Sequence, residues 1–578
     1  MKLPVRSESI EPRTGPKGQP APAPDMLRVI PLGGVGEFGK NMMVVEFGDD
    51  MVCVDCGQKF PEEEMLGVDL VIPDFGYVLE AGDRLRGLVL THGHEDHLGA
   101  VPHLLRQMTY RRLPIYGSRL TLALLREKLI EMDVLDGADL IEVADRELID
   151  IGALRIAFFQ VPHSFPDAMA LVIETPVGAL LHTGDFKFEP INGGRLPASL
   201  RAILRHLKGR RPLLLMADST NIDRDGHSPN ETQVREGLTR FFRDAPRTII
   251  LTSFSTNIDR IQTILDLARQ FGRKVAICGF SLDRNFNIAG ELGLLQYPAG
   301  LVLPLHELRQ VPPESRVIIT TGSQGEPLSA LSRMALNSFR GYTVQPEDLI
   351  IFSSRIIPGN ERSIYKLINH FYRHGAKVVT ERDGAVHASG HAYRDEMRLL
   401  LREVRPRFFM PIHGELRQLM RHGELAIECG LKEEEVFILE NGMQLNLGED
   451  WAEAQPTDWA GIVLVDGRMM DGVEQIVLRD RKHLAEDGML TVILVIDKQS
   501  HRIMAGPDLV SRGFIVVDNN EPLMQGCKDL VARTFEECPK ESQEEWDTVK
   551  AAVRKALRRY LADQTDRYPV ILPVVVEI

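Results

Sequence analysis

One short stretch constrains this chain more than any other. The apolar run Leu88-Val-Leu-Thr leads directly into His92-Gly-His-Glu-Asp-His, so four side chains that can bind a metal fall within six residues: His92, His94, Asp96 and His97. A strand that runs into a turn directs alternate side chains to one point, so His92 and His94 can share one ion. Asp96 and His97 lie beyond the bend and can reach a second ion.

A solvated loop that happens to be rich in His and Asp is the alternative interpretation of this stretch. The length of the His-x-His-x-Asp-His pattern and the strand-like run directly before it argue against that alternative. We therefore expect a metal-binding turn here, followed by a helix over Leu98–Gln107.

The composition indicates a large globular protein with more than one core. The chain has 578 residues, 44% hydrophobic and 26% charged, and its length predicts about four units of roughly 150 residues. It shows no run of about 20 apolar residues and no Lys/Arg-then-apolar signal layout, so we expect neither a membrane span nor secretion. Six cysteines are too few for a disulfide framework, so we expect reduced thiols and a cytoplasmic location. The net charge of −14 argues against a protein that coats nucleic acid but permits an enzyme that grips a few phosphates in a local groove.

Several segments have a simple structural interpretation. Residues 1–25 are rich in proline and are predicted to be a disordered tail. The glycines that begin at Gly33 are followed by the strand-like Met42-Met-Val-Val-Glu-Phe rather than by a helix, which excludes a nucleotide-binding loop. Cys53-x-x-Cys56 has no second cysteine pair and is predicted to pack in the core. Asp55 leaves the same strand and can hydrogen-bond the metal-bearing loop from behind.

Apolar strands then alternate with amphipathic helices, which favours an α/β sandwich with helices covering sheets. The expected strands are residues 26–32, 42–47, 51–55, 88–91, 154–161, 168–174, 179–182 and 213–217, and the expected helices are 120–132 and 197–207. Two further ligand candidates, His163 and Asp185, lie directly after strand ends, where functional residues collect on a rigid scaffold.

At this point the motifs resemble a known fold. The run from His92 to His97, then His163 and Asp185, with Asp55 as an earlier acidic motif, is similar to the metal motifs of the metallo-β-lactamase fold. Ala217-Asp218-Ser-Thr-Asn, Val386-His387-Ala-Ser389-Gly390-His391 and Met410-Pro-Ile-His413 resemble the motifs of its β-CASP group, which cleaves nucleic acids. Thr321-Gly-Ser-Gln-Gly-Glu-Pro and Ile357-Pro-Gly-Asn-Glu resemble bacterial ribonuclease J. One departure is Gly279-Phe280-Ser281, where the family pattern has Arg between Gly and Ser.

The resemblance implies a metallo-β-lactamase αββα sandwich with an inserted β-CASP α/β domain and a small α+β C-terminal domain. The sandwich would comprise residues 26–222 and 376–450, with the chain returning to it at Lys377, and the β-CASP domain residues 223–375. Residues 451–463 would be a linker and residues 464–578 the C-terminal domain. In the insertion we expect strands at 248–252, 275–278, 317–320 and 349–352 and helices at 258–271 and 362–374. In the last domain we expect strands at 462–465, 475–478, 490–496, 513–517 and 570–578 and a helix at 546–564.

The resemblance also implies a set of roles for individual residues. His92, His94 and His163 would hold one Zn²⁺, and Asp96, His97 and His413 a second, with Asp185 bridging the two and Mn²⁺ as a substitute or additional ion. His391 would act as general acid, oriented by Asp218, and Asp96 would belong to the catalytic set as well as to the ligands. A 5′-phosphate pocket would be formed by residues of both domains: Ser323, Gln324, His387, Ala388, Ser389, Gly390 and His391.

The implied function is metal-dependent hydrolysis of RNA phosphodiesters. The enzyme would act as a 5′-to-3′ exonuclease that prefers 5′-monophosphate ends and also as an endonuclease, in rRNA processing and mRNA decay. Its partners would be single-stranded RNA, further copies of itself in a homodimer or homotetramer, and other RNA-decay proteins. The alternatives are a DNA-acting β-CASP nuclease, a hydrolase of a small thioester, lactone or lactam, and a non-catalytic RNA-binding protein. The inserted domain and the late histidines argue against the small-molecule hydrolase, and the complete ligand set argues against the non-catalytic protein.

Overall fold

The computed structural model describes residues 26–578 except 63, 189–194, 358, 458, 468–469, 471–474, 498–499, 501 and 539–545. The tail expected at residues 1–25 lies outside the described residues. The chain divides into two compact units: unit 1 runs to Lys59 and resumes over Ile72–Ile462, and unit 2 combines Phe60–Val71 with Val463–Ile578. No helix among the described residues is long and apolar enough to cross a membrane.

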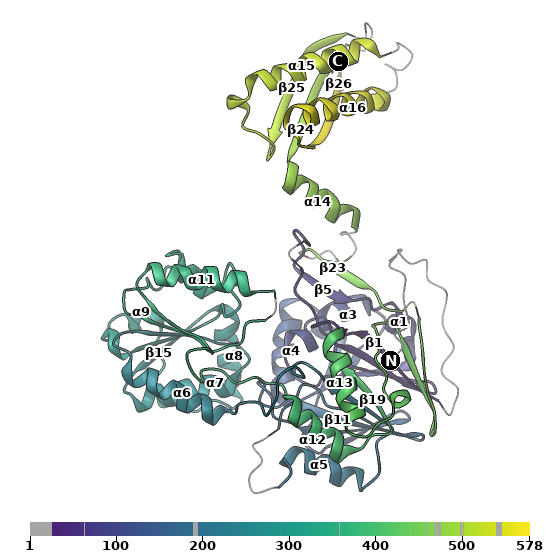
Figure 1. The fold of residues 1–578 in the computed structure, drawn as a ribbon, viewed down its shortest axis with the longest axis vertical. Helices are drawn as coiled ribbons and strands as arrows, with labels where there is room; N and C mark the ends of the chain where they lie inside the picture. The colour runs from purple at the N-terminus through teal and green to yellow at the C-terminus, as the bar shows by residue number, and fades with distance from the viewer. Residues whose placement is uncertain are drawn as a thin grey trace. The chain divides into compact units, whose positions relative to one another are not determined.

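The first part of unit 1 is a sandwich of two sheets (Figure 1). The eight-stranded sheet has the order β22-β21-β1-β3-β4-β6-β7-β8 and the six-stranded sheet the order β19-β13-β12-β11-β10-β9. Each sheet packs on the other sheet with one face and on helices with the opposite face. The sequences of their strands are therefore continuous apolar runs. In the eight-stranded sheet the strands are β1 (Leu27–Gly33), β3 (Met42–Phe47), β4 (Asp50–Val54), β6 (Leu85–Val89), β7 (Leu113–Gly117), β8 (Ala138–Glu142), β21 (Gln444–Leu447) and β22 (Ala452–Gln455).

The six-stranded sheet and the helices complete this sandwich. Its strands are β9 (Leu148–Ile151), β10 (Leu154–Gln160), β11 (Met169–Thr175), β12 (Gly178–His182), β13 (Leu214–Asp218) and β19 (Phe408–Ile412). The helices are α1 (Gly76–Glu80), α2 (Glu95–Leu98), α3 (Val101–Gln107), α4 (Arg119–Glu131), α5 (Ala198–Leu207), α12 (Arg394–Val404) and α13 (Leu416–Glu428). Two-residue strands β2 (Val35–Gly36) and β20 (Gly414–Glu415) pair beside the site.

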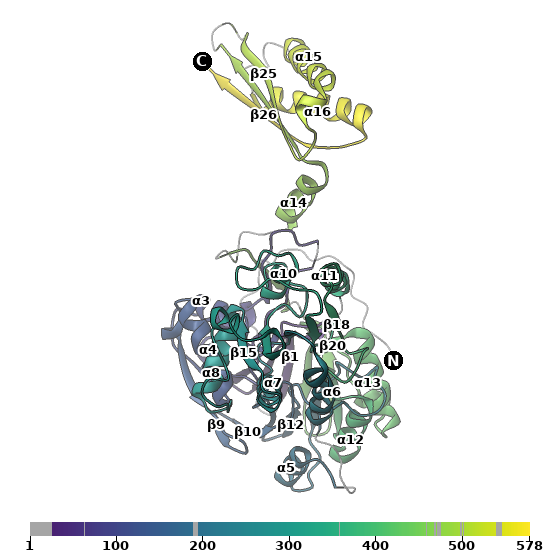
Figure 2. The ribbon, with the colours of Figure 1, turned by 90° about the vertical axis from the view of Figure 1, so that its left-hand side faces the viewer.

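A second domain is inserted between β13 and β19 and lies beside the sandwich (Figures 1 and 2). Its parallel sheet has the order β15-β16-β14-β17-β18. Alternate residues of β14 face opposite cores, so Ile249 and Leu251 pack with α6, α7 and α8, and Ile250 packs with α10 and α11. The elements are α6 (Glu231–Asp244), β14 (Ile249–Thr252), α7 (Ile258–Gln270), β15 (Lys274–Cys278), α8 (Phe280–Glu291), α9 (Leu305–Leu308), β16 (Arg316–Thr320), α10 (Ala330–Ala335), β17 (Leu349–Phe352), α11 (Glu361–Arg373) and β18 (Lys377–Val379).

Two predicted boundaries of unit 1 are wrong. The chain does not return to the sandwich at Lys377, because β18 pairs in parallel with β17 in the inserted sheet. The segment expected to be a linker contributes a strand, since β22 pairs with β21 at the edge of the eight-stranded sheet. Ala452 and Ala454 pack against the main core from this strand, and such small side chains give little apolar signal in the sequence.

Unit 2 has a core of its own beneath a three-stranded sheet of order β25-β24-β26. Side chains of β24 alternate between buried and half-buried because helices cover only one face of this sheet. Its elements are β23 (Ile462–Val465), which pairs with β5 (Leu70–Pro73), then α14 (Gln475–Asp487), β24 (Met489–Ile496), β25 (Ile503–Arg512), α15 (Glu521–Glu537), α16 (Trp546–Thr565) and β26 (Val570–Glu577).

The sequence prediction is wrong at two places in unit 2. Gln475–Leu478 was expected to be a strand and begins helix α14, and the strand expected at residues 513–517 is replaced by β25 directly before it. A short apolar run fits a strand and a helix equally well, so its periodicity does not decide. The expected architecture is observed: a sandwich of two sheets covered by helices carries an inserted α/β domain and is followed by a C-terminal α+β domain.

Candidate metal centre and active site

The metal-binding turn begins at His92, three residues after the end of β6, and runs into the short helix α2. His92 and His97 are fully buried, and the carboxylate of Asp96 is about one-third exposed. Gly93 is required between the first two histidines, because a Cβ there would lie 2.6 Å from the ring of Phe165. The turn can therefore present its ligands only while small residues keep the backbone tight against that ring.

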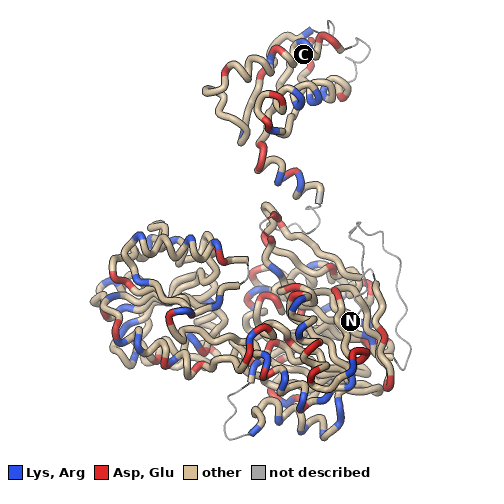
Figure 3. The backbone as a smooth tube through the Cα atoms, viewed as in Figure 1, with Lys and Arg blue, Asp and Glu red and all other residues tan. Residues whose placement is uncertain are grey.

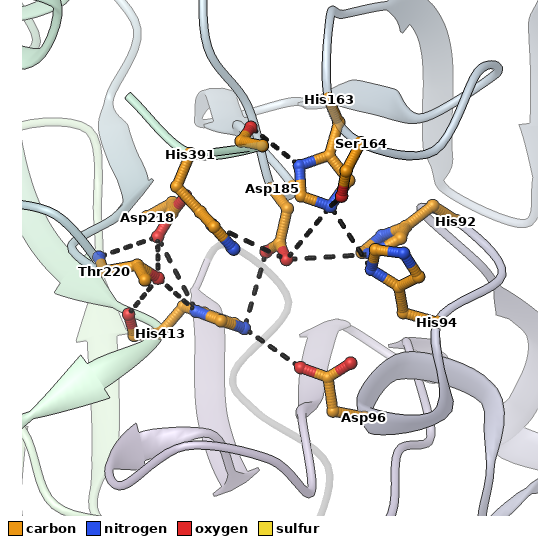
Figure 4. Close-up of polar contacts among 12 residues, drawn as sticks. His92, His94, Asp96, His163, Ser164, Asp185, Asp218, Thr220, His391 and His413 are labelled. Atoms are coloured by element: carbon orange, nitrogen blue, oxygen red, sulfur yellow. Dashed lines mark hydrogen bonds and ion pairs between the residues drawn. The ribbon is translucent and has the colours of Figure 1, made fainter. Parts of the chain in front are cut away.

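The first predicted ligand set comes together around one point (Figure 4). His92, His94, His163 and Asp185 each offer one atom, and these atoms lie within 4.8 Å of one another. The Nε2 atom of His92 is 3.0 Å from Nδ1 of His94, and Nε2 of His163 is 3.3 Å from the same atom. Asp185 Oδ2 lies 3.7 Å from His92 Nε2 and 3.8 Å from His163 Nε2.

The second predicted set lies on the other side of Asp185 and contains Asp96, His97 and His413. His413 Nε2 is 3.3 Å from Asp96 Oδ2 and 3.6 Å from Asp185 Oδ1, and His97 Nε2 is 3.3 Å from Asp185 Oδ2. Ligand atoms about 2.1 Å from a tetrahedral ion lie about 3.4 Å apart. The spacings in both sets match that geometry, so the side chains present fit two divalent cations that share Asp185.

The nitrogen that faces away from the centre is held in three of these histidines. His97 Nδ1 is 2.8 Å from Asp55 Oδ2, and Asp55 also accepts from the backbone N–H and hydroxyl of Thr91 at 2.7 and 2.8 Å. His163 Nδ1 is 2.8 Å from the carbonyl oxygen of Gly390, and His413 Nδ1 is 2.8 Å from the hydroxyl of Thr220. Such contacts fix which ring nitrogen is free to bind a metal. Asp55 therefore lies where the sequence predicted it.

The three histidines of the first set are neutral imidazoles. Burial, reinforced by neighbouring imidazoles, lowers the pKa of His92 and His163 well below the ordinary value for histidine. Burial likewise lowers the pKa of His94 to about 4. These rings therefore present free lone pairs at neutral pH, as metal ligands must.

The second set carries strong negative potential. Burial disfavours the charged form of His97 and His413, but the neighbouring carboxylates, above all that of Asp185, outweigh it. They raise the pKa of His97 well above its usual range and that of His413 to about 9. In turn the two histidines hold the pKa of the Asp96 carboxyl below its ordinary value, because their attraction outweighs the cost of its partial desolvation. A positive charge is stabilised at this position, and a divalent cation would supply it.

His391 lies beside both sets without being needed by either. Its Nδ1 atom is 2.8 Å from Asp218 Oδ2 and 3.9 Å from Asp185 Oδ2. Asp218 is fully buried, and its other oxygen accepts from the backbone N–H and hydroxyl of Thr220. A third possible metal group, Asp185 with Asp218, His391 and His413, shares two members with the sets above. A metal pair held by those two sets would leave His391 and Asp218 outside both.

Comparison with known proteins identifies the domains. Residues 54–245 match the β-lactamase superfamily domain, and residues 246–371 match the ribonuclease J β-CASP domain. Residues 375–439 match the RNA specificity domain of Zn-dependent metallo-hydrolases, and residues 476–578 the ribonuclease J C-terminal domain. Ribonuclease J2 of Bacillus subtilis is 35% identical over 96% of this chain and 99% of its own length. The chain belongs to the ribonuclease J family. Ribonuclease J 1 of Streptococcus pyogenes is 37% identical over 96% of this chain and 98% of its own.

A solved structure supports the fold independently. A crystal structure of a protein of unknown function from Enterococcus faecalis superimposes with a TM-score of 0.51 at 16% identity, covering 73% of this chain and all of its own. The protein is thus a metal-dependent ribonuclease of the ribonuclease J family, and RNA is its substrate.

The predicted phosphate pocket of this ribonuclease J family member is only partly assembled from the residues that the sequence indicated. Ser389 is buried, and its hydroxyl accepts from Asn221 at 2.8 Å and from the backbone N–H of His391 at 3.2 Å. Gln324 has another use: its side chain donates to the carbonyl of Arg355 and accepts from the N–H of Ile357. Gln324 therefore holds the loop after β17 and has little capacity left for a phosphate.

Sequence reasoning missed several residues that shape this site. The guanidinium of Arg355 donates to Asn221, and burial lowers its pKa. The ammonium of Lys187 donates to the carbonyl of Ser389 at 3.0 Å, and the hydroxyl of Thr220 contacts His413. The only sequence signal was their place directly after strands or ligands, which is too weak to single them out.

Proposed function

We propose that this ribonuclease binds two Zn²⁺ ions, for which Mn²⁺ can substitute. We also propose that it degrades RNA from the 5′ end with a preference for 5′-monophosphates and cuts internally as well. The observation that carries the proposal is the contact of 2.8 Å between His391 Nδ1 and Asp218 Oδ2. This pair lies beside two ligand sets that share Asp185. When bound, two such cations lower the pKa of a shared water and neutralise charge on the phosphoryl group.

His391 is the proposed general acid. Its Nδ1–H donates to Asp218, so Nε2 is the nitrogen left to exchange a proton with the substrate. Asp218 cannot rotate freely, because Thr220 holds its second oxygen. In this role His391 protonates the leaving 3′-oxygen, and the downstream product keeps a 5′-phosphate.

The 5′-monophosphate preference would come from hydroxyl and backbone groups rather than from a basic cluster. Ser323 and Ser389 are both buried, one in each domain, and Arg355 reaches Asn221, which in turn donates to Ser389. Hydroxyls and backbone N–H groups can bind a phosphate with little help from charge. Along the described chain Lys and Arg are interspersed with Asp and Glu (Figure 3), which suits an enzyme that holds few phosphates.

Digestion of RNA and matching DNA, both labelled along the whole strand, tests the proposal. Each strand is supplied with a 5′-monophosphate, triphosphate or hydroxyl end, with and without chelator. We expect single nucleotides released from the 5′ end of monophosphorylated RNA, slower loss of the triphosphate form, and no cleavage with chelator. Equal rates for monophosphate and triphosphate would refute the pocket, and preferential cleavage of DNA would show a DNA-acting nuclease instead.

His391→Ala tests the general-acid role. We expect cleavage to fall about 10²- to 10⁴-fold while the metal content stays at the wild-type value, because His391 belongs to neither ligand set. His306, whose side chain is 78% exposed, is the matched control, and His306→Ala should change neither property. A His391→Ala enzyme that keeps both its metal and its activity would show that another group donates the proton.

A further inference from the structure

Phe280 is an exposed aromatic ring at a functional edge of the β-CASP domain. It is the first residue of α8 and is 78% exposed, whereas Leu282 and Phe286 of the same helix are buried. An exposed ring gives up the free energy that its burial would gain, but single exposed apolar side chains are common. The exposure of Phe280 alone is therefore no evidence of a binding role, and only the place where the residue lies can indicate one.

That position is the carboxyl edge of the inserted parallel sheet, where α/β sheets bind ligands. Phe280 follows the end of β15, and the loop that carries Ser323 follows the end of β16; Cys278 and Thr320 are partners in these paired strands. The backbone N–H of Thr321 donates to the carbonyl of Cys278 at 3.2 Å. Phe280 and the proposed phosphate pocket therefore leave the same edge on adjacent strands.

On its other side Phe280 is linked to the metal-binding turn. Arg284, one turn further along α8, has its guanidinium 5.8 Å from the centre of the Phe280 ring and pairs with Glu131 of α4 at 3.2 Å. The same helix α4 carries Lys128, which pairs with Glu95, the residue between ligands His94 and Asp96. Helix α8, which begins with Phe280, is thus tied to α4 of the sandwich and starts at the same sheet edge as the Ser323 loop.

We propose that Phe280 is a stacking site for a base of the single-stranded RNA substrate. Aromatic side chains bind unstacked bases through their faces and do so with little dependence on sequence. Stacking also gives affinity without positive charge, which a chain of net charge −14 needs. A second exposed apolar side chain, Leu328 at 88%, belongs to the loop that follows Ser323. The proposal rests on the ribonuclease activity proposed above but not on its preference for a 5′ end.

Steady-state cleavage of monophosphorylated RNA by Phe280→Ala, Phe280→Leu and Phe280→Trp tests the proposal. Loss of one stacked base is expected to raise KM about tenfold for the Ala and Leu variants, with kcat within about twofold of wild type because the metal ligands are untouched. Phe280→Trp should keep the wild-type KM. Equal KM values for wild type and Phe280→Ala would refute the proposal.

RNA with a single abasic position separates stacking from a general structural effect. When the missing base is the one that stacks, wild type and Phe280→Ala should bind the RNA equally, and the tenfold difference should return when the abasic position is moved. Binding is measured in the His391→Ala background, which is expected to keep its metals and to cleave about 10²- to 10⁴-fold more slowly. A difference that persists at every abasic position would show that Phe280 acts on the fold rather than on a base.

Two controls make the outcomes distinguishable. Tyr372 of α11 is 58% exposed on the same domain, and Tyr372→Ala should leave KM unchanged. Sedimentation velocity of Phe280→Ala should give the wild-type mass; a smaller particle would show that the ring contacts a second copy of the chain and would refute the stacking site. Absence of cleavage by the wild-type enzyme would refute the proposed function itself, whereas failure confined to the Phe280 variants refutes only this inference.

Discussion

Asp55 shows how a single side chain can organise a metal site that it does not join. It takes a left-handed backbone conformation, with φ of +62°, and its carboxylate binds both Thr91 and Nδ1 of His97. The ring of His97 is thereby oriented with Nε2 toward Asp96 and Asp185. The same logic applies to Gly390 behind His163 and to Thr220 behind His413.

Asp55→Asn is expected to weaken zinc binding about 10- to 100-fold. Asn tolerates the left-handed conformation, so the backbone should persist, but an amide N–H would face the ring N–H of His97 or the hydroxyl of Thr91. Titration of the metal-free enzyme with Zn²⁺ against a chromophoric chelator measures the effect. Asp150→Asn, at an exposed position paired with Arg155, should bind as wild type; equal affinities for both variants would contradict the role of Asp55.

His422 predicts a pH dependence of stability. It is fully buried on α13 against Ser219 and Phe409, and burial lowers its pKa to about 3. Between pH 6.5 and 3, His422 is protonated in the unfolded chain but neutral in the folded chain. The free energy of unfolding therefore decreases as the pH falls below 6.5. The loss is about 2 kcal/mol at pH 5. His422→Phe should remove this part of the loss, measured as the difference between urea unfolding at pH 7 and pH 5; an unchanged difference would contradict it.

All seven ligands proposed from the sequence come together, because each follows a strand end and the strands are unmistakably apolar. Residues that act on the ligands from behind could not be found in the same way. Thr220 and Lys187 are ordinary residues in the sequence, and only the return of β19 beside β13 brings Thr220 to His413. Gln324, singled out as a phosphate ligand, is occupied by loop contacts that no local pattern reveals.

At the level of elements, long apolar strands and amphipathic helices of unit 1 were predictable, whereas edge and short elements were not. The first turn of helix α14 contains Ile476-Val-Leu, which suits a strand, but Val477 and Leu478 pack against Val68 and Val71 from far earlier in the chain. That long-range packing, absent from any local window, decides the conformation.

Helix α7 holds the β-CASP domain together through Arg260, which is fully buried. Its guanidinium binds Glu231 of α6 at 2.9 and 3.0 Å and the carbonyl of Val386 at 3.0 Å, just before the His387–His391 segment. Arg260→Gln is expected to cost about 3 kcal/mol of stability, because it leaves Glu231 and the carbonyl without their partner. Chemical denaturation measures this cost.

The matched control for Arg260 is Arg243, which pairs with Asp244 while both side chains are 63% exposed. Arg243→Gln should cost less than about 0.5 kcal/mol, because water already screens this pair. A similar decrease in the free energy of unfolding for the two variants would show that the buried contacts of Arg260 stabilise the protein no more than an exposed ion pair does.

At the scale of the whole molecule, the metal ligands all belong to unit 1, and unit 2 has a separate core of Leu490, Val492, Val531, Leu557 and their neighbours. We expect two unfolding transitions in calorimetry. A chelator should lower only the transition of unit 1, because a ligand stabilises the part that binds it. Equal shifts of both transitions, or a single transition throughout, would contradict this division.

The composition of unit 2 from Phe60–Val71 and Val463–Ile578 has a consequence for synthesis on the ribosome. Val68 and Val71 emerge early, but Leu464, Val477 and Leu478, against which they pack, follow almost 400 residues later. At roughly 5–20 residues per second, the early apolar segment waits about 20–80 s for its partners. We therefore expect this apolar segment to stay exposed during translation until the rest of unit 2 has been made.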